Sequence, residues 1–262
     1  MKKWLLRLFG LCAIVCAQTS FLSSSHTSEL HEHNFGRLVQ EVYPGAQFWF
    51  NAMIKKYPQA HLEQTKFCVS DEYASGVEEI YFPFYVLEMM HKVFKNAHLH
   101  GVTDEMFVQF AEDEYLLLHE AKHVLSKDIE HGDQAIAGSM VLSFGTSFLL
   151  AYKTLKEDIN VSTAVAGSVA SIAAAYVALC SYAQFQERRA DDFANQNADA
   201  RTLRAGACWF KRLDVLMNLE SISVPEIFNT IAKIIQDPTH PLPLNRQNKA
   251  LRALLIRFGQ TA

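Results

Sequence analysis

Two histidines and a glutamate stand close together at His119, Glu120 and His123. On an α-helix, residues four apart lie about 40° apart around the axis, so both imidazoles would face one point. Neutral imidazole nitrogen is a common zinc ligand, and this spacing supplies two ligands from one rigid element. Glu120 would stand about 100° from His119, beside a metal rather than on it. A general base for a metal-bound water has to stand there.

The element that must position these residues is a helix predicted to begin after an N-cap at Thr103. It is expected to run to about residue 129, with Gly132 as its stop. Residues 116–125 are apolar on nearly every side, which is typical of a helix that lies through a core. The alternative is a pair of satisfied core histidines, because the motif occurs by chance in roughly three chains of a hundred of this size.

A catalytic zinc takes three protein ligands and leaves a fourth position open for water. The candidate third ligand is Glu187, which lies near the start of the polar segment at residues 186–194. Asp191 follows one helical turn later on the same face, where it could accept a hydrogen bond from a ligand imidazole. Alone, this charged segment is typical of a solvated turn. Together with the histidine pair, it favours a metal site.

Two long uncharged segments, residues 134–152 and 159–186, lie between the motifs. Each is long enough to span a bilayer as a helix, and both contain small residues common in membrane helix pairs. A buried helical hairpin in a soluble domain is the alternative, since both segments are only moderately hydrophobic. Uncharged segments of this length favour membrane insertion. Two crossings would return Glu187 to the side that holds His119.

Residues 1–17 resemble a secretory signal, because Lys2 and Lys3 precede a short apolar stretch with small residues near its end. An uncleaved membrane anchor is the alternative. Either form predicts export to the cell envelope, as a membrane-associated or periplasmic protein. A polar arm is expected over residues 18–40, where a loose group of histidines is more typical of a solvated tail than of a metal site. One domain would follow over residues 41–262.

Composition excludes two classes of protein. With 24 Lys+Arg against 28 Asp+Glu, the chain has no basic footprint for nucleic acid. Its 18 Phe, 9 Tyr and 3 Trp are too many for a disordered chain. Removal of residues 1–17 would leave Cys68, Cys180 and Cys208, which offer no CxxC pair. Cys68 and Cys208 could pair in an oxidising compartment, but buried, unpaired thiols are the favoured interpretation.

The remaining pattern predicts a mainly helical α+β fold. Aromatic and β-branched residues gather in two short expected strands, residues 66–69 and 79–84. Helical periodicity predicts further helices at residues 46–57, 85–96, 199–219, 225–235 and 245–258. A rigid turn with three prolines is expected before the last of these helices.

The motifs together resemble one family. HEAKH, a hydrophobic hairpin, ERRAD and then HPLPLNR are similar in order and spacing to the HtpX-type and CaaX-prenyl-protease-type zinc metallopeptidases. These are gluzincins with an HExxH…ExxxD signature, and the resemblance covers roughly residue 65 to the C-terminus. It implies a zincin-like domain with a small sheet beside the HExxH helix. It also implies one zinc ion per chain and a polypeptide substrate.

By this resemblance, His119, His123 and Glu187 bind zinc, Glu120 is the catalytic base and Asp191 supports a ligand from behind. The segment at residues 77–82 resembles the strand beside the catalytic helix of the family. Its edge would hold an extended peptide substrate by strand addition.

His240 and Arg246 match a C-terminal feature of the same family. His240 would stabilise the oxyanion or approach the open zinc position; an ordinary loop histidine is the alternative. Arg246 would pair with a carboxylate at the site, or would simply be solvated.

The sequence therefore predicts a zinc metalloendopeptidase that hydrolyses peptide bonds with Glu120 as general base. The resemblance suggests a role in envelope protein quality control, with misfolded or membrane proteins as substrates. A latent or non-catalytic zinc protein of chaperone type is the alternative from another class. A membrane scaffold with a fortuitous HExxH motif, which would bind no metal, is a third.

Overall fold

A computed structural model describes residues 34–96, 103–156, 158–220 and 238–259. The chain divides into two compact units, Met1–Phe35 and Gly36–Ala262. All the described helices and strands belong to the second unit. The predicted leader, most of the polar arm and the helix predicted over residues 225–235 lie outside the described residues.

A small sheet forms where two strands are predicted. β1 (Lys66–Ser70) runs parallel to β3 (Glu79–Pro83), and a two-residue strand, β2 (Ala74–Ser75), pairs with β3 in the antiparallel sense. One face of this sheet is packed against a helix, because the fully buried ring of Phe82 makes edge contacts with the ring of Trp49. The predicted strands are therefore confirmed, and β2 is additional.

β3 is the central strand, with the order β1-β3-β2. β2 covers it at Ile80 and Tyr81, and β1 pairs along its other side. The prediction that residues 77–82 offer a free edge to a peptide is therefore wrong over this stretch. The cause is a tight turn at Gly76, whose amide donates a 2.7 Å hydrogen bond to the carbonyl of Glu79 and folds β2 back onto β3.

The single long helix predicted around the two histidines is wrong, because the chain breaks twice. α7 (Asp104–Val108) is short, and α8 (Ala111–Leu125) begins as a separate helix. At the end of α8, Lys127 takes a left-handed conformation with φ of 52° and turns the chain into α9 (Asp128–Leu155). Gly132, the predicted stop, lies inside α9. A lysine carries no sequence signal for such a break, so only tertiary packing decides it.

α8 lies through the core, as its apolar sequence predicts. It contacts β2, β3 and two helices further along the chain, α10 (Val161–Asn197) and α11 (Ala200–Glu220). Its residues Tyr115, Leu117 and Leu118 are fully buried. Glu114 is also fully buried, and its carboxylate forms an ion pair with Lys56. The other partners of this carboxylate are Tyr57, Arg201 and Thr202. The helix is therefore fixed in position along its whole length.

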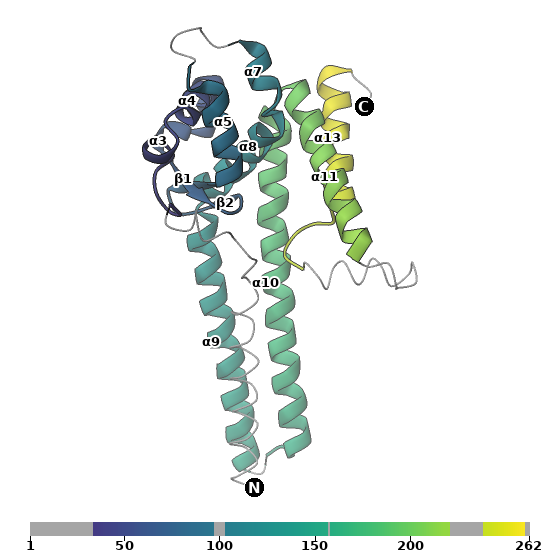
Figure 1. The fold of residues 1–262 in the computed structure, drawn as a ribbon. Helices are drawn as coiled ribbons and strands as arrows, with labels where there is room; N and C mark the ends of the chain where they lie inside the picture. Colours follow the sequence, from purple (N-terminus) through teal and green to yellow (C-terminus); the bar gives the residue numbers. More distant parts are fainter. Residues whose placement is uncertain (1–33, 97–102, 157, 221–237, 260–262) are drawn as a thin grey trace. The chain divides into compact units, whose positions relative to one another are not determined.

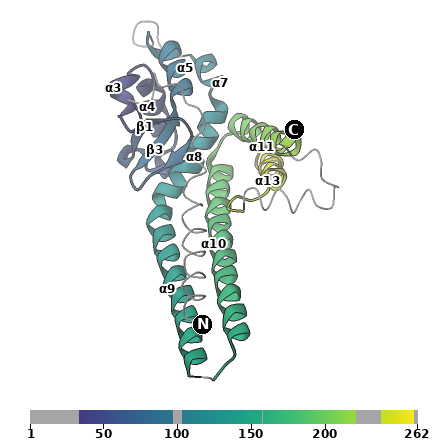
Figure 2. The ribbon, with the colours of Figure 1, turned by 60° about the horizontal axis from the view of Figure 1, so that its bottom comes forward.

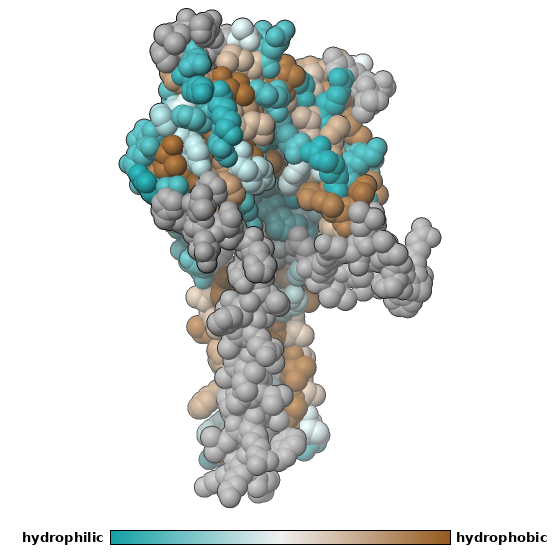
Figure 3. All heavy atoms as spheres, in the orientation of Figure 1, coloured by the Kyte–Doolittle hydropathy of each residue, from teal (hydrophilic) through white to brown (hydrophobic). Residues whose placement is uncertain are grey.

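α9 and α10 (Val161–Asn197) pack along each other as a hairpin (Figures 1 and 2). They are close enough that a Cβ on Gly167 would lie 2.8 Å from the side chain of Leu150. Both helices are long and apolar enough to cross a membrane. Large apolar side chains are exposed along them, and brown atoms mark those in view in Figure 3. The exposed apolar side chains of the two helices include Val141, Leu142, Phe148, Leu155, Val169, Tyr176 and Val177.

Two further helices complete the unit, α11 (Ala200–Glu220) and α13 (Pro243–Phe258). They lie side by side, and α11 also packs on α8 (Figures 1 and 2). α4 (Ala46–Lys56) and α5 (Phe84–Phe94) cover the sheet, and a one-turn helix, α3 (Val39–Val42), precedes them. The prediction of a mainly helical fold with a small sheet and a hydrophobic hairpin is confirmed.

The three described cysteines are unpaired. Cys68 is buried, Cys180 is half-buried and Cys208 is exposed. Cys68 and Cys208 therefore form no disulfide, and only Cys68 matches the prediction of a fully buried thiol.

Candidate metal centre

Three side chains from two helices converge between α8 and α10. His119 and His123 lie one turn apart on α8, and Glu187 extends from α10. One ligand atom from each of the three lies within 4.8 Å of the others. The two imidazole Nε2 atoms are 3.2 Å apart, and each lies 3.3 Å from a different oxygen of the Glu187 carboxylate. This group could hold a metal ion.

The donor set fits a divalent metal. Nδ1 of each ring faces a carboxylate and donates to it, so both neutral rings present an Nε2 lone pair. Two lone pairs 3.2 Å apart repel each other unless an imidazole carries an extra proton or a cation lies between them. Oε2 of Glu187 is buried and makes no short hydrogen bond: Nε2 of His119 lies 3.3 Å from it and Nη2 of Arg246 lies 3.4 Å from it. Two imidazole nitrogens and one carboxylate are a ligand set of catalytic zinc sites, in which a fourth position stays open.

Each imidazole is held from behind by a carboxylate. Nδ1 of His119 lies 3.1 Å from Oδ1 of Asp191, as the one-turn spacing from Glu187 predicts. Nδ1 of His123 lies 2.9 Å from Oδ2 of Asp128, at the start of α9. Such contacts orient a ligand imidazole and make it more basic. Asp128 escaped the sequence analysis because it falls inside the single helix predicted there.

Each of these carboxylates is in turn bound by an arginine. Arg246 makes two hydrogen bonds to Asp191, of 2.8 and 2.7 Å, and its guanidinium lies over the ring of Phe210. Arg189 makes a 2.9 Å hydrogen bond to Asp128. Arg246 is therefore buried and paired rather than solvated. The role of Arg189 was also missed, since it depends on Asp128.

The carboxylates around the centre favour protonated imidazoles. Burial lowers the pKa of His123, but hydrogen bonds to Asp128 and Glu187 outweigh it and raise this pKa to about 10. For His119, burial is likewise outweighed, because hydrogen bonds to Asp191 and Glu187 raise its pKa. The carboxylates thus favour positive charge between the two rings. A bound metal ion would supply that charge in place of the protons.

A cavity of about 490 Å³ opens onto this group. Glu120 lines it together with His119 and Glu187, so the glutamate of the motif faces the space beside the ligand atoms. The cavity is of a size that holds a peptide segment or a small molecule.

His240 also lines the cavity and lies at its edge, with 47% of its side chain exposed. Its Nε2 lies 3.6 Å from Oε1 of Glu187, and its Nδ1 lies 3.1 Å from the hydroxyl of Thr239. It is outside the group of three ligand residues. The structure thus brings His240 to the site without assigning it a role.

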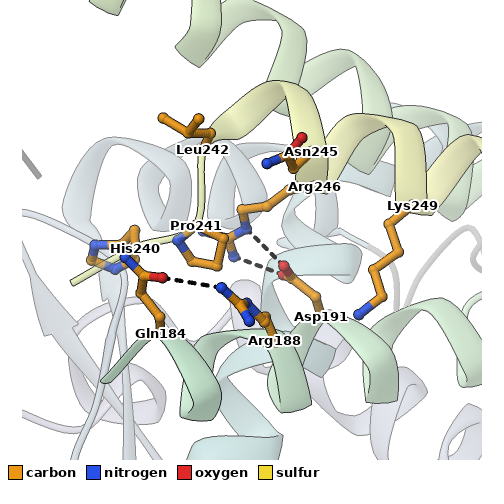
Figure 4. A pocket seen from close by; sticks show the side chains of 9 residues that line it. All are labelled: Gln184, Arg188, Asp191, His240, Pro241, Leu242, Asn245, Arg246 and Lys249. Carbon is orange, nitrogen blue, oxygen red and sulfur yellow. Dashed lines mark hydrogen bonds and ion pairs between the residues drawn. The ribbon is translucent and has the colours of Figure 1, made fainter. Parts of the chain in front are cut away.

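A second cavity, of about 350 Å³, shares four lining residues with the first: His240, Pro241, Leu242 and Arg246. Figure 4 shows Arg246 reaching from α13 to Asp191 on α10, with Arg188 turned toward Gln184. The bonds between Arg246 and Asp191 join α13 to α10, whereas the bond between Arg188 and Gln184 lies within α10.

No family model matches this chain, and no curated protein or solved structure matches it. The resemblance to zinc metallopeptidases therefore stays a prediction. It has to be judged on the geometry of this centre.

Proposed function

We propose that this chain is a zinc-dependent metalloendopeptidase, with a zincin-like domain and a polypeptide substrate. The observation that supports it best is the convergence of His119, His123 and Glu187 on one point, with Glu120 in the adjoining cavity. Ligands, base and substrate space are the three parts that peptide-bond hydrolysis at a metal needs. All three occur together here.

Each residue of the centre would have its own role in the reaction. Zinc, when bound, supplies a Lewis acid that polarises a carbonyl and lowers the pKa of a bound water to about 7. Glu120 accepts the proton of the attacking water and later delivers it to the leaving amine. Asp191 and Asp128 hold the two imidazoles with their Nε2 atoms toward each other.

We infer that His240 assists at the same carbonyl. A donor at the mouth of the cavity can bind the oxygen on which negative charge develops, and such donors contribute strongly to catalysis. Arg246 does not face the substrate alone, because Asp191 binds its guanidinium at two points. We therefore assign Arg246 a positioning role behind His119.

A latent zinc protein of chaperone type is the second candidate. His240 Nε2 lies 3.6 Å from Glu187, so a small shift would bring this imidazole to the fourth metal position. A site closed in this way would keep its metal and lose its water. Turnover of substrate separates the two candidates, whereas metal content alone does not.

We also propose that α9 and α10 anchor the chain in a membrane of the cell envelope. Both apolar stretches end close to the metal centre, since Asp128 begins α9 and Glu187 follows residues 159–186 directly. The site would then lie beside the membrane surface, where misfolded envelope proteins are accessible. Carbonate extraction of the expressed chain tests this anchor: release into the soluble fraction would contradict it.

The decisive experiment compares the wild type with Glu120→Gln for zinc content and for cleavage of casein. Glu105→Gln, on the exposed face of α7, is the matched control. We expect about one zinc per chain in all three. Cleavage should fall by about 10²-fold or more in Glu120→Gln alone, since the ligands survive and the base does not.

The other outcomes are equally informative. Zinc without cleavage in the wild type would contradict the peptidase and favour the latent form. A folded chain that binds no zinc would overturn both.

A further inference from the structure

We propose that the cavity beside the metal centre receives a large apolar side chain of the bound polypeptide, against a stripe of α11. The stripe consists of Trp209, Leu213 and Met217. This inference rests on the proposed function and names the substrate residue that the site prefers.

The lining of the cavity divides into two kinds of wall. The charged part of the lining holds three acidic and three basic side chains: Glu72, Glu120 and Glu187, and His119, His240 and Arg246. The apolar wall combines the stripe of α11 with Leu116 of α8. Residues four apart share one face of a helix, so the three stripe residues form a continuous surface along α11.

The stripe adjoins the face by which α11 joins the core. That core face is fully buried at Leu203 and Phe210. Trp209, Leu213 and Met217 are only half-buried, and they border the cavity instead. An apolar group that entered would remove their remaining surface from water, which is favourable in proportion to the area covered.

The apolar wall is fixed close to the ligands. A Cβ on Gly206 would lie 2.5 Å from the ring of Tyr115, so only glycine lets α11 approach α8 this closely. An ion pair between Arg212 and Glu112 joins the same two helices again. Leu116, next to Tyr115, stands one turn before His119 on α8. The wall therefore begins beside a ligand residue.

The position of the apolar wall beside His119 defines which substrate residue contacts it. A side chain seated on the wall belongs to a residue that flanks the bond held at the metal centre. The volume of about 490 Å³ accommodates a backbone segment together with a ring or a branched side chain. Acidic side chains are disfavoured, because a carboxylate seated on the apolar wall would lose its hydration without gaining a hydrogen-bond partner there.

The test uses zinc-loaded protein and peptides of one Ala/Gly-rich background that differ in a single central residue, Phe, Leu, Ala or Glu. Mass spectrometry maps the cleaved bond, and kcat/KM is compared between peptides. We expect a preference of about 10- to 100-fold for Phe or Leu over Ala, and the poorest cleavage next to Glu. Equal cleavage of all four peptides would overturn the proposal.

Variants on α11 assign the preference to the stripe. Leu213→Ala should reduce the Phe-over-Ala ratio by about tenfold. Leu216→Ala is the matched control, since Leu216 lies three residues further along α11, is 56% exposed and is not among the residues that line the cavity. Leu213→Phe should narrow the space and shift the preference from Phe toward Ala. An equal change in Leu213→Ala and Leu216→Ala would overturn the assignment.

A binding measurement keeps this proposal distinct from the peptidase itself. Tryptophan fluorescence reports peptide binding to zinc-loaded Glu120→Gln, and the part of the change that is lost in Trp209→Phe comes from the cavity rather than from Trp4 or Trp49. The Phe peptide should bind at least tenfold more tightly than the Ala peptide, and Leu213→Ala should abolish the difference. Binding with this preference but without cleavage in the wild type would contradict the peptidase and support the pocket. Cleavage of all peptides without any preference would support the peptidase and contradict the pocket.

Discussion

Oδ2 of Asp128 lies 2.9 Å from Nδ1 of His123, although the two residues belong to different helices. The left-handed turn at Lys127 makes this contact possible, because it directs the first residue of α9 back to the last turn of α8. Asp191 makes the corresponding contact to His119 from α10. Each imidazole is thus fixed from behind, and its Nε2 faces the position of a metal.

Asp128→Asn should weaken zinc binding by about 10- to 100-fold, because an amide orients the His123 imidazole less strongly than a carboxylate. Competition against a chelator of known affinity measures the change. Asp133→Asn is the control, since Asp133 is exposed on the same helix. Equal zinc affinity in Asp128→Asn and the wild type would show that the carboxylate does not support the ligand.

Zinc binding should release protons. Without metal, His123 has a pKa of about 10 and is protonated at neutral pH, and a metal ion can bind only its neutral form. Titration calorimetry in buffers of different ionisation enthalpy should therefore detect release of at least one proton per zinc at pH 7. Zinc affinity should fall as pH is lowered. A heat of binding that is the same in all buffers would contradict this protonation state.

Without metal, the stability of the folded chain should depend on pH. A histidine whose pKa is raised by folding contributes stability that is complete below its unfolded pKa near 6.5. That stability is lost as pH rises toward the folded pKa of about 10. Thermal melts of the zinc-free protein should therefore show a falling Tm between these values, and the zinc-loaded protein should show a smaller decrease.

Asp113 provides a second pH effect, away from the metal ligands. Burial raises its pKa from 3.8 to about 6, against the opposing effect of a hydrogen bond from Tyr73. The folded chain therefore holds this proton more tightly than the unfolded chain. The stability gained in this way is present below pH 3.8 and is lost as pH rises through about 6.

Asp113→Asn removes the charge and keeps an oxygen that can accept the hydrogen bond from Tyr73. At pH 7 the free energy of unfolding of the variant should exceed that of the wild type by on the order of 1–3 kcal/mol. This difference should become smaller toward pH 4. Urea denaturation of both proteins in detergent over this pH range measures the difference. Parallel curves for the two proteins would show that Asp113 has an ordinary pKa.

Gly206→Ala should destabilise the chain by about 1–3 kcal/mol, because the added methyl group would meet the ring of Tyr115 at 2.5 Å. α11 would have to move away from α8, so the peptide preference should weaken as well. Gly138→Ala is the control, since nothing lies within 4 Å of a Cβ there and alanine favours a helix. A Tm for Gly206→Ala equal to that of the control would contradict the close approach.

Much of the candidate site could be predicted from local sequence. Residues at i and i+4 of a helix share a face wherever the helix lies, so the pairing of His119 with His123 needs no tertiary information. The same holds for Glu187 and Asp191. That these two pairs meet follows from the hairpin, because the part of α10 up to Glu187 is about as long as α9 and returns the chain to its starting level.

The contacts that complete the centre were decided by the tertiary structure. Asp128 reaches His123 only because the chain breaks at Lys127, and a lysine gives no local sign of a left-handed turn. β2 occupies the edge of β3 that was expected to be free. Arg246 lies 55 residues from Asp191 along the chain, and its pairing depends on how α13 packs against α10. Helical periodicity determines which residues share a face, whereas packing determines which faces meet.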